Sequence, residues 1–238
     1  MTTPPAPPSL RRAADRGTTR LDWLDSRHSF SFGEYFDPQH MGFRALRVIN
    51  DDVVAPGGGF GEHPHRDMEI LTWVLEGALR HRDSLGHGGV IHPGELQAMT
   101  AGSGIRHSEM NDSASEPVHL LQIWIVPARR ALIPAYAQRA FSAEGRRNRW
   151  QAVASGGGEE GALKINQDAA LHLADLGPGA AISRDVPASR HGYLHVAYGS
   201  ISIEGHDLKS GDALMIDGPA ALSIRAQAPS QLLCFDLA

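Results

Sequence analysis

The sequence has little cysteine: Cys234 is the single thiol in 238 residues. One thiol excludes an intrachain disulfide framework, and it excludes zinc and iron–sulfur sites that need several thiolates. Cys234 lies in the apolar segment QLLCFDL, which is typical of a buried strand in which cysteine behaves as a small apolar residue. A reactive thiol is therefore not expected.

Long apolar runs and basic stretches are also missing. No segment approaches the ~20 apolar residues of a membrane-spanning helix, and the opening MTTPPAPPSLRR lacks the apolar core of a secretory signal. The formal net charge of −5 at pH 7 gives no electrostatic reason to bind DNA or an anionic membrane. We therefore expect a cytoplasmic protein without a nucleic-acid or membrane partner.

What the chain does have is turn formers, with 26 glycines and 15 prolines. From about residue 41, short β-branched or alternating runs are separated by these turn residues, as in FRALRVIN, EILTWVLEGALRHRD and VHLLQIWIVP. Runs this short and regular are typical of an antiparallel sandwich or barrel. The predicted fold class is all-β.

The same strand pattern occurs in both halves of the chain. In each half a strand ending in Glu-Gly is followed by a glycine turn, and the region between the halves has few β-branched residues. This repetition predicts two β-barrels of similar design. We expect an N-terminal barrel over residues 1–130, a linker with a short helical turn over 131–150, and a second barrel over 151–238.

Two pairs of metal-ligand residues lie in the first half. His63 and His65 occur in HPHRDME, and His107 and Glu109 occur roughly forty residues later in GIRHSEMN. Side chains two apart on a strand point to the same face, so each pair can aim into a barrel. Three nitrogens and one carboxylate suit iron, manganese, nickel, copper or zinc, and do not suit calcium or magnesium. The pattern predicts a mononuclear metal site.

The motifs around these residues resemble those of the cupins and, within them, the pirin family. The matching segments are RVINDD, GGGFGEHPHRDME, LEG, DSLG and MTAGSGIRHSE, in that order. The resemblance is close from about Phe30 to Pro127 and looser through the second half. It is specific because several motifs occur together in the right order and spacing.

The resemblance implies a bicupin, which is a pair of jelly-roll barrels with a metal only in the first. Its ligands would be His63, His65, His107 and Glu109, and Glu69 would lie behind them. Iron(II) is the expected metal, with nickel, manganese, copper and zinc as alternatives. The second half lacks the histidine pairs, so it is expected to be a cupin-like domain without a metal.

The resemblance further implies a dioxygenase that cleaves flavonols such as quercetin with O2. Four ligands leave one or two positions open for substrate oxygen or dioxygen, and Glu109 would act as the general base that accepts the proton of the 3-hydroxyl. Asp67 and Met68 stand where many pirins have Gly-Phe. This departure leaves the ligands untouched but alters the pocket wall, so the substrate preference stays open.

Two other functions remain as alternatives. Some pirin-like proteins are thought to act as non-catalytic regulators that bind other proteins in response to the redox state of the metal, and this chain could have such a protein partner. Another cupin reaction, such as sugar isomerisation, is the weaker alternative because no phosphate-binding cluster supports it.

Several nearby residues are given less specific roles. Four further histidines lack partners at ligand spacing and are expected to be solvated or in loops: His81, His87, His92 and His119. Glu69 or Asn111 could orient a ligand histidine, although Glu69 could equally be a strand-edge carboxylate that faces solvent. Trp73, Trp124 and Met99 alternate on predicted strands and are expected to pack in the core.

Overall fold

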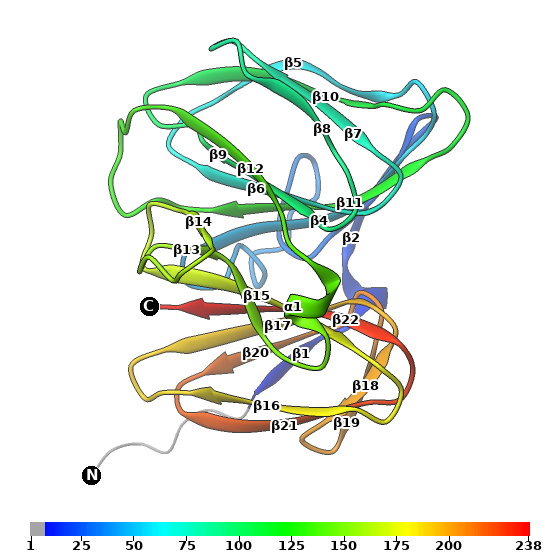
Figure 1. Ribbon diagram of the computed structural model, residues 1–238, viewed down its shortest axis with the longest axis vertical. Coiled ribbons are helices and arrows are strands. Elements are labelled where there is room, and N and C mark those ends of the chain that lie inside the picture. Colours follow the sequence, from blue (N-terminus) through cyan, green and yellow to red (C-terminus); the bar gives the residue numbers. More distant parts are fainter. Residues whose placement is uncertain (1–7) are drawn as a thin grey trace. The chain divides into compact units, whose positions relative to one another are not determined.

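The computed structural model describes residues 8–238, and nearly all of its regular structure is β-strand (Figure 1). The chain forms two compact units. The N-terminal unit contains residues 17–141 and 163–167, and the C-terminal unit contains the described residues up to 16 together with 142–162 and 168–238. The all-β prediction is confirmed.

The N-terminal unit has two antiparallel sheets packed face to face (Figure 1). The longer sheet has the order β12-β9-β6-β11-β4-β3-β2, and the shorter one has the order β5-β10-β7-β8. The strands are β2 (Gly17–Leu21), β3 (Leu24–His28), β4 (Leu46–Val54), β5 (Gly59–His65), β6 (Glu69–Glu76), β7 (Leu79–Asp83), β8 (Gly88–Ile91), β9 (Glu95–Thr100), β10 (Ile105–Asn111), β11 (Val118–Ile125), β12 (Ala135–Ala140) and β14 (Leu163–Lys164).

Apolar side chains from both sheets form the core of this unit. Val54 and Leu120 of the longer sheet pack with Leu79 and Ile91 of the shorter one, all fully buried. Burying a side chain of this size stabilises the fold by about 1.5–3 kcal/mol. The larger Trp73 is also buried, as its strand pattern predicts.

The C-terminal unit repeats the arrangement. One sheet contains the order β1-β20-β17-β22-β15-β13, and the other has the order β16-β21-β18-β19. Its elements are β1 (Ser9–Arg11), the 3-10 helix η1 (Ala13–Asp15), α1 (Ala143–Arg146), β13 (Gln151–Ser155), β15 (Ala169–Leu176), β16 (Ala181–Val186), β17 (His191–Tyr198), β18 (Ser200–Ile203), β19 (His206–Lys209), β20 (Ala213–Asp217), β21 (Ala220–Ala226) and β22 (Ser230–Leu237). Cys234 is buried in the core between these sheets, as predicted, and burial raises the pKa of its thiol to about 11.

The region 131–150 contains more structure than the expected linker. Residues 135–140 form β12, which pairs along its length with β9. Gln138 donates its side-chain Nε2 to the Val90 carbonyl oxygen at 2.9 Å, which also ties β12 to the shorter sheet. One face of β12 is exposed, so this edge strand forms without the β-branched residues that would have signalled it. The expected helical turn is α1, whose N-cap Ser142 accepts from the Gly145 N–H.

The start of the described chain also differs from the expected boundaries. Ser9–Arg11 pairs with β20, and Asp212 accepts hydrogen bonds from the Ala13 N–H at 2.7 Å and from Arg12 at 3.0 Å. This segment therefore belongs to the C-terminal unit rather than to the first barrel. The pairing joins residues about 200 positions apart, and no local pattern in the sequence reports such a contact.

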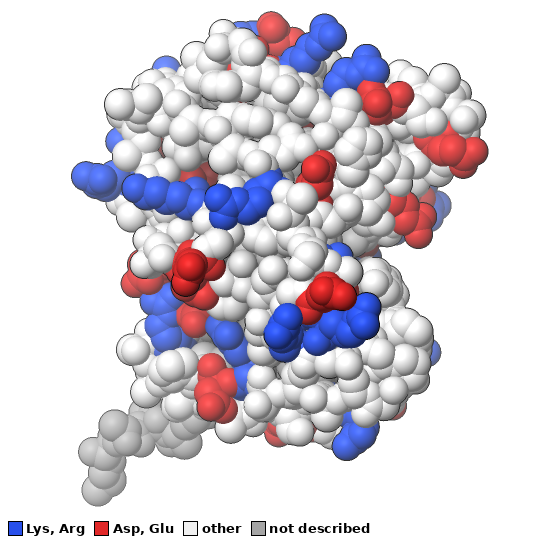
Figure 2. All heavy atoms as spheres, viewed as in Figure 1, with Lys and Arg blue, Asp and Glu red and all other residues white. Residues whose placement is uncertain are grey.

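The surface carries mixed charge. On the face drawn in Figure 2, acidic and basic side chains are interspersed and most of the area is uncharged. A short row of basic side chains crosses the upper part of that face, with acidic side chains close to it. Within residues 8–238, no helix is long and apolar enough to cross a membrane.

Candidate metal centre

The four predicted ligands come from two adjacent strands of the shorter sheet in the N-terminal unit. His63 and His65 lie on β5, and His107 and Glu109 lie on β10. His63 is directly opposite His107 in the register, and the pairing shifts between His107 and Glu109. Because residues two apart share a face of a strand, this register brings both pairs to the same side of the sheet. The shift is a bulge, a feature that re-aims side chains at functional sites.

Three imidazoles converge at this place. Ligand nitrogens of His63, His65 and His107 all lie within 4.8 Å of one another. The closest pair is Nε2 of His63 and Nε2 of His107, which are 3.1 Å apart. The ring centroids of the three residues are 4.5–4.8 Å apart. The fold therefore brings together the three histidines of the two sequence pairs.

A backbone contact sets the proton position on one of these rings. Nδ1 of His63 lies 2.7 Å from the carbonyl oxygen of Gly61. A carbonyl only accepts, so Nδ1 of His63 carries the proton and donates it. The lone pair is then on Nε2, the atom that faces His107, which is the tautomer a metal ligand needs.

Burial keeps the inner rings uncharged. Burial, with a smaller effect from the neighbouring His63, lowers the pKa of His65 to about 4. Burial likewise lowers the pKa of His107 to about 2, with smaller effects from His63, His65 and His81. Neutral imidazoles present lone pairs at neutral pH, as metal ligation requires.

Glu109 is buried but held by different partners. Thr72 Oγ1 donates to its Oε1 at 3.3 Å, and Gln122 Nε2 donates to its Oε2 at 2.8 Å. Its carboxylate is within 4.8 Å of ligand nitrogens of His81 and His107, and it is not a member of the three-histidine group. Burial raises the pKa of Glu109 to about 7, although both hydrogen bonds oppose that shift. The carboxyl can therefore exchange a proton near neutral pH.

His81 was expected to be solvated or in a loop, and that prediction is wrong. Its side chain on β7 is fully buried, and its Nδ1 lies 3.4 Å from Nδ1 of His107. The strand pairing between β7 and β10 makes this contact, since Glu109 is directly opposite His81. A usable signal was present in the sequence, because His81 and Asp83 have the same two-residue spacing as the recognised pairs.

Glu69 and Asn111 have partners away from the histidines. Glu69 is buried, and it accepts from Thr100 Oγ1 at 3.0 Å and from the Asn166 side chain at 3.2 Å. Asn111 donates to the carbonyl oxygens of Val54 and Glu116. These hydrogen bonds do not connect Glu69 to a histidine of the cluster, and its side chain does not face solvent. Glu69 instead joins β6 to the segment 163–167.

A cavity of about 480 Å³ opens beside the histidine cluster. Its wall includes aromatic side chains and buried polar groups, with His63, His65 and Glu109 also exposed to it. Trp124, expected in the core, lines this cavity and packs edge-on against His65 at a centroid distance of 4.9 Å. A space of this size is in the range that holds a small organic ligand, about 300–1,000 Å³.

Asp52 adds a second buried carboxyl to the cavity wall. Burial raises the pKa of Asp52 to about 7, against a hydrogen bond from Ser26 that lowers it. Two carboxyls with raised pKa values therefore line one cavity, and perturbed groups gathered in a cleft are typical of a functional site.

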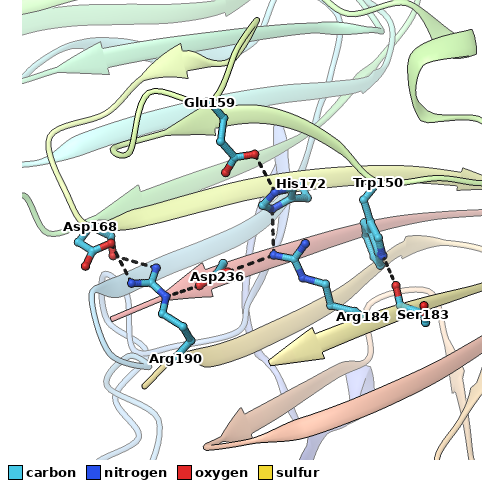
Figure 3. Close-up of polar contacts among 8 residues, drawn as sticks. All are labelled: Trp150, Glu159, Asp168, His172, Ser183, Arg184, Arg190 and Asp236. Carbon is cyan, nitrogen blue, oxygen red and sulfur yellow. Dashed lines mark hydrogen bonds and ion pairs between the residues drawn. The ribbon is translucent and has the colours of Figure 1, made fainter. Parts of the chain in front are cut away.

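The corresponding part of the C-terminal unit is built differently (Figure 3). There the short-sheet strand β16 contributes Arg184, which donates to Asp236 at 3.2 Å and to Nδ1 of His172 at 3.4 Å. His172 contacts Glu159 at 3.2 Å, and Arg190 donates to Asp236 at 2.5 Å. Among residues 8–238, both candidate metal-binding groups lie in the N-terminal unit.

The donor set fits a borderline transition metal. Three imidazole nitrogens converge, a carboxylate lies next to one of them, and the cavity gives a small molecule access to the same place. Nitrogen ligands favour iron, nickel, manganese, copper or zinc over calcium and magnesium. The arrangement can therefore bring a metal, a buried proton acceptor and an organic ligand together.

Comparisons with known proteins agree with this architecture. Residues 10–125 match the family model described as pirin, and residues 152–237 match the model described as quercetinase C-terminal cupin domain. A relative from Mycobacterium tuberculosis is 48% identical over 231 residues, which cover 96% of this chain and 94% of that protein. An Escherichia coli K12 protein named quercetin 2,3-dioxygenase is 46% identical over 229 residues, covering 96% of this chain and 97% of its own.

Solved structures give the same result. The crystal structure of YhhW from Escherichia coli has a TM-score of 0.93 and 45% identity, covering 97% of both chains. A second structure, of the bacterial pirin YhhW in complex with nickel(II), has a TM-score of 0.91 and 45% identity, and covers 97% of this chain and 98% of that one. The resemblance read from the motifs is thus confirmed, and this chain belongs to the pirin family of bicupin proteins.

Proposed function

We propose that this chain is a metal-dependent dioxygenase of the pirin type that cleaves flavonols such as quercetin with O2. The observation that carries the proposal is the cluster of three imidazoles that opens into an aromatic-walled cavity of about 480 Å³. The name of the Escherichia coli relative, at 46% identity, supports the choice of substrate.

The proposed ligands are His63, His65, His107 and Glu109. The first three already bring their nitrogens within 4.8 Å of one another, and Glu109 lies near His107. Iron(II) is the metal we propose, and nickel, manganese, copper or zinc would suit the same donors. The nickel(II) complex of the related Escherichia coli pirin supports a first-row metal at this type of site.

A bound metal would supply Lewis acidity toward a substrate hydroxyl and an open position for dioxygen. The protein's own part is to bind and orient the flat ring system. Trp124 stands edge-on to His65, and Trp23 packs edge-on against Phe60 at 5.1 Å on the same cavity wall. Aromatic side chains of this kind bind a planar phenol and exclude water from around it.

Glu109 is the proposed general base. It would take the proton of the flavonol 3-hydroxyl and hold it on a carboxylate oxygen, because its raised pKa of about 7 makes the protonated form accessible near neutral pH. Thr72 and Gln122 each donate to one of its oxygens and so hold the carboxyl in place. The substrate then carries the negative charge that makes its ring reactive toward O2.

The decisive experiment uses the purified protein stripped of metal and reloaded with one divalent ion at a time. We expect aerobic loss of the visible absorbance of quercetin, together with uptake of one O2 per flavonol, only in the loaded samples. A chelator should stop both signals. Absence of turnover with iron, nickel, manganese, copper and zinc alike would overturn the proposal.

The cavity also favours catalysis over the regulatory alternative. A protein that only senses redox state has no need for a ligand-sized space against its metal ligands, whereas an enzyme does. A stoichiometric protein partner, recovered in a manner that depends on the oxidation state of the metal, would favour the regulator instead.

A further inference from the structure

His107 has a second buried imidazole directly behind it. Its Nε2 faces His63, and its Nδ1 lies 3.4 Å from Nδ1 of His81. The far side of His81 faces a carboxylate, because Nε2 of His81 is 3.6 Å from Oδ2 of Asp83. We propose that His81 and Asp83 form a positioning relay that fixes the tautomer and the orientation of His107 for metal binding. This inference rests on the proposed metal site.

The proton positions along this row follow from simple donor counting. If Nε2 of His107 faces the metal, its Nδ1 carries the ring proton and must donate. The acceptor in reach is Nδ1 of His81, so His81 keeps its own proton on Nε2. The carboxylate of Asp83 lies 3.6 Å from Nε2, beyond hydrogen-bond distance, and favours a proton there as a nearby negative charge. Each ring therefore has one assigned tautomer, and the series ends on a negative charge.

Asp83 is fixed independently of the histidines. Its side chain is fully buried, and its Oδ1 accepts the backbone N–H groups of Leu85 at 2.9 Å and His87 at 3.0 Å. Its Oδ2 faces His81 and also accepts from Nδ1 of the exposed His87 at 3.0 Å. Oδ1 thus anchors the carboxylate to the turn, and Oδ2 is shared between the hydrogen bond from His87 and the approach of His81.

Strand pairing and ring stacking hold His81 in place. On β7, His81 is opposite Glu109 and Asp83 is opposite His107 in the register with β10. Tyr136 of β12 stacks on the His81 ring at 4.8 Å with an interplanar angle of 20°. The relay residues are not among those that line the cavity, so they can be changed without altering the wall that would contact substrate.

An alternative role for His81 is direct ligation together with Glu109 and His107, since donor atoms of these three are also within 4.8 Å of one another. The observed contacts favour the relay because Nδ1 of His81 already contacts Nδ1 of His107 at 3.4 Å and its Nε2 is 3.6 Å from the Asp83 carboxylate. Asp83 belongs to neither candidate ligand group. Asp83 is therefore not a candidate ligand itself, and the tautomer of His81 distinguishes an effect through His81 from an effect through the turn that Asp83 holds.

The test measures the affinity for Zn²⁺ and Ni²⁺ by competition with a chromophoric chelator. Asp83→Asn can keep the Oδ1 acceptor for the turn while it replaces the acceptor that faces His81. We expect about 10-fold weaker metal binding for this variant, and for His81→Phe a loss of about 10–100-fold. His81→Gln should recover part of the loss, because its amide oxygen can accept from His107. The matched control, His87→Gln, removes the exposed neighbour of Asp83 and should bind metal like the wild type.

A second readout reports the tautomer directly. In the zinc-loaded wild type, long-range ¹H–¹⁵N spectra should show His107 protonated on Nδ1 and His81 protonated on Nε2. Asp83→Asn should shift the His81 signals toward a mixture of tautomers. A merely structural role for Asp83 would alter thermal stability without this change.

The outcomes are separable. If the wild type binds neither metal, the proposed function fails before the relay is addressed. If the wild type binds metal and both Asp83→Asn and His81→Phe bind it equally tightly, the relay is overturned. If His81→Phe loses binding while Asp83→Asn keeps it with an unchanged His81 tautomer, His81 is a ligand and the relay is likewise overturned.

Discussion

Glu109 illustrates how the N-terminal barrel changes the chemistry of a single side chain. In water a glutamic acid is ionised at neutral pH, but burial raises the pKa of Glu109 to about 7. The hydrogen bonds from Thr72 and Gln122 limit that rise and hold the carboxyl in position. A group balanced in this way can accept a proton and return it within one reaction cycle.

Glu109→Gln should therefore lose most of the flavonol-cleaving activity. A neutral amide of the same shape cannot accept the proton, and positioned bases of this kind contribute about 10²–10⁴-fold to a rate. The measurement is the initial rate of quercetin absorbance loss at saturating metal. Glu69→Gln is the matched control, because Glu69 is another buried carboxylate of this unit whose partners are Thr100 and Asn166. Unchanged kcat in Glu109→Gln would exclude the proposed role.

The sequence points to the histidines that cluster in the N-terminal unit because their spacing is a property of single strands. His63 and His65 form one pair and His107 and Glu109 the other, and strand geometry alone puts each pair on one face. His81 has the same spacing from Asp83, but its importance depends on the pairing of β7 with β10. Pairing partners cannot be read from a local pattern, so the spacing marks His81 as a candidate but does not place it behind His107.

At the scale of elements, the close approach of β5 and β10 depends on a glycine. Gly59 has φ +154°, and a Cβ placed there would lie 2.4 Å from the carbonyl oxygen of Glu109 and 2.6 Å from Cα of Met110. Both contacts are with backbone, so a side chain could fit only if the strands separated. The separation would occur at the bulge that positions Glu109.

Gly59→Ala should thus weaken both the fold and metal binding. We expect a loss of about 1–3 kcal/mol in the free energy of unfolding, from overpacking and from a backbone conformation that disfavours alanine. Urea denaturation and chelator competition measure the two effects. Gly61→Ala provides the control on the same strand, since a Cβ at Gly61 meets nothing within 4 Å. Equal behaviour of the two variants would contradict this account.

A second element, the segment containing β1 and η1, depends on Asp212. Arg12 and the backbone N–H groups of Ala13 and Lys209 donate to this carboxylate. These contacts outweigh burial and hold the pKa of Asp212 below its usual value. A carboxyl whose pKa is lower in the folded state stabilises the fold above the unfolded pKa, and this contribution is lost as the pH falls through the folded pKa.

Asp212→Asn should reduce the free energy of unfolding by about 1–2 kcal/mol at pH 7, because charge-assisted hydrogen bonds are lost. The difference from the wild type should shrink as the pH falls below about 4, where the wild-type carboxyl also becomes protonated. Urea denaturation followed by circular dichroism between pH 7 and pH 2.5 measures this trend. Asp15→Asn, at an exposed position of the same segment, should have little effect. A difference that persists undiminished at pH 2.5 would refute the assignment.

At the scale of the whole molecule, metal binding should stabilise one unit selectively. A ligand present at 100 times its Kd adds about 2.7 kcal/mol to the stability of the state that binds it. For a unit of this size that corresponds to a rise in Tm of roughly 10 °C. Trp23, Trp73 and Trp124 lie in the N-terminal unit, so their fluorescence should follow the transition that responds to metal and to chelator.

His107→Ala is the matching control for the thermal experiment. It removes one imidazole of the cluster, so adding metal should leave its Tm nearly unchanged. A metal-dependent rise in Tm as large as that of the wild type would mean that the ion binds elsewhere.

The two-barrel architecture could be predicted because both halves of the chain show the same order of strands and glycine turns. The limits of the units could not. Residues 135–140 form an edge strand with small and polar side chains, so composition alone suggested a linker. The pairing of Ser9–Arg11 with β20 depends on residues at opposite ends of the sequence, and such long-range contacts leave no periodic signal.

That last pairing constrains the order in which the protein can be completed during synthesis. A ribosome releases the chain from its N-terminus, and units generally fold as they emerge. Nearly all of the N-terminal unit, residues 17–141, is available early. Ser9–Arg11 leaves the ribosome first of all these strands, yet it must wait for β20, one of the last, before its backbone groups find their partners.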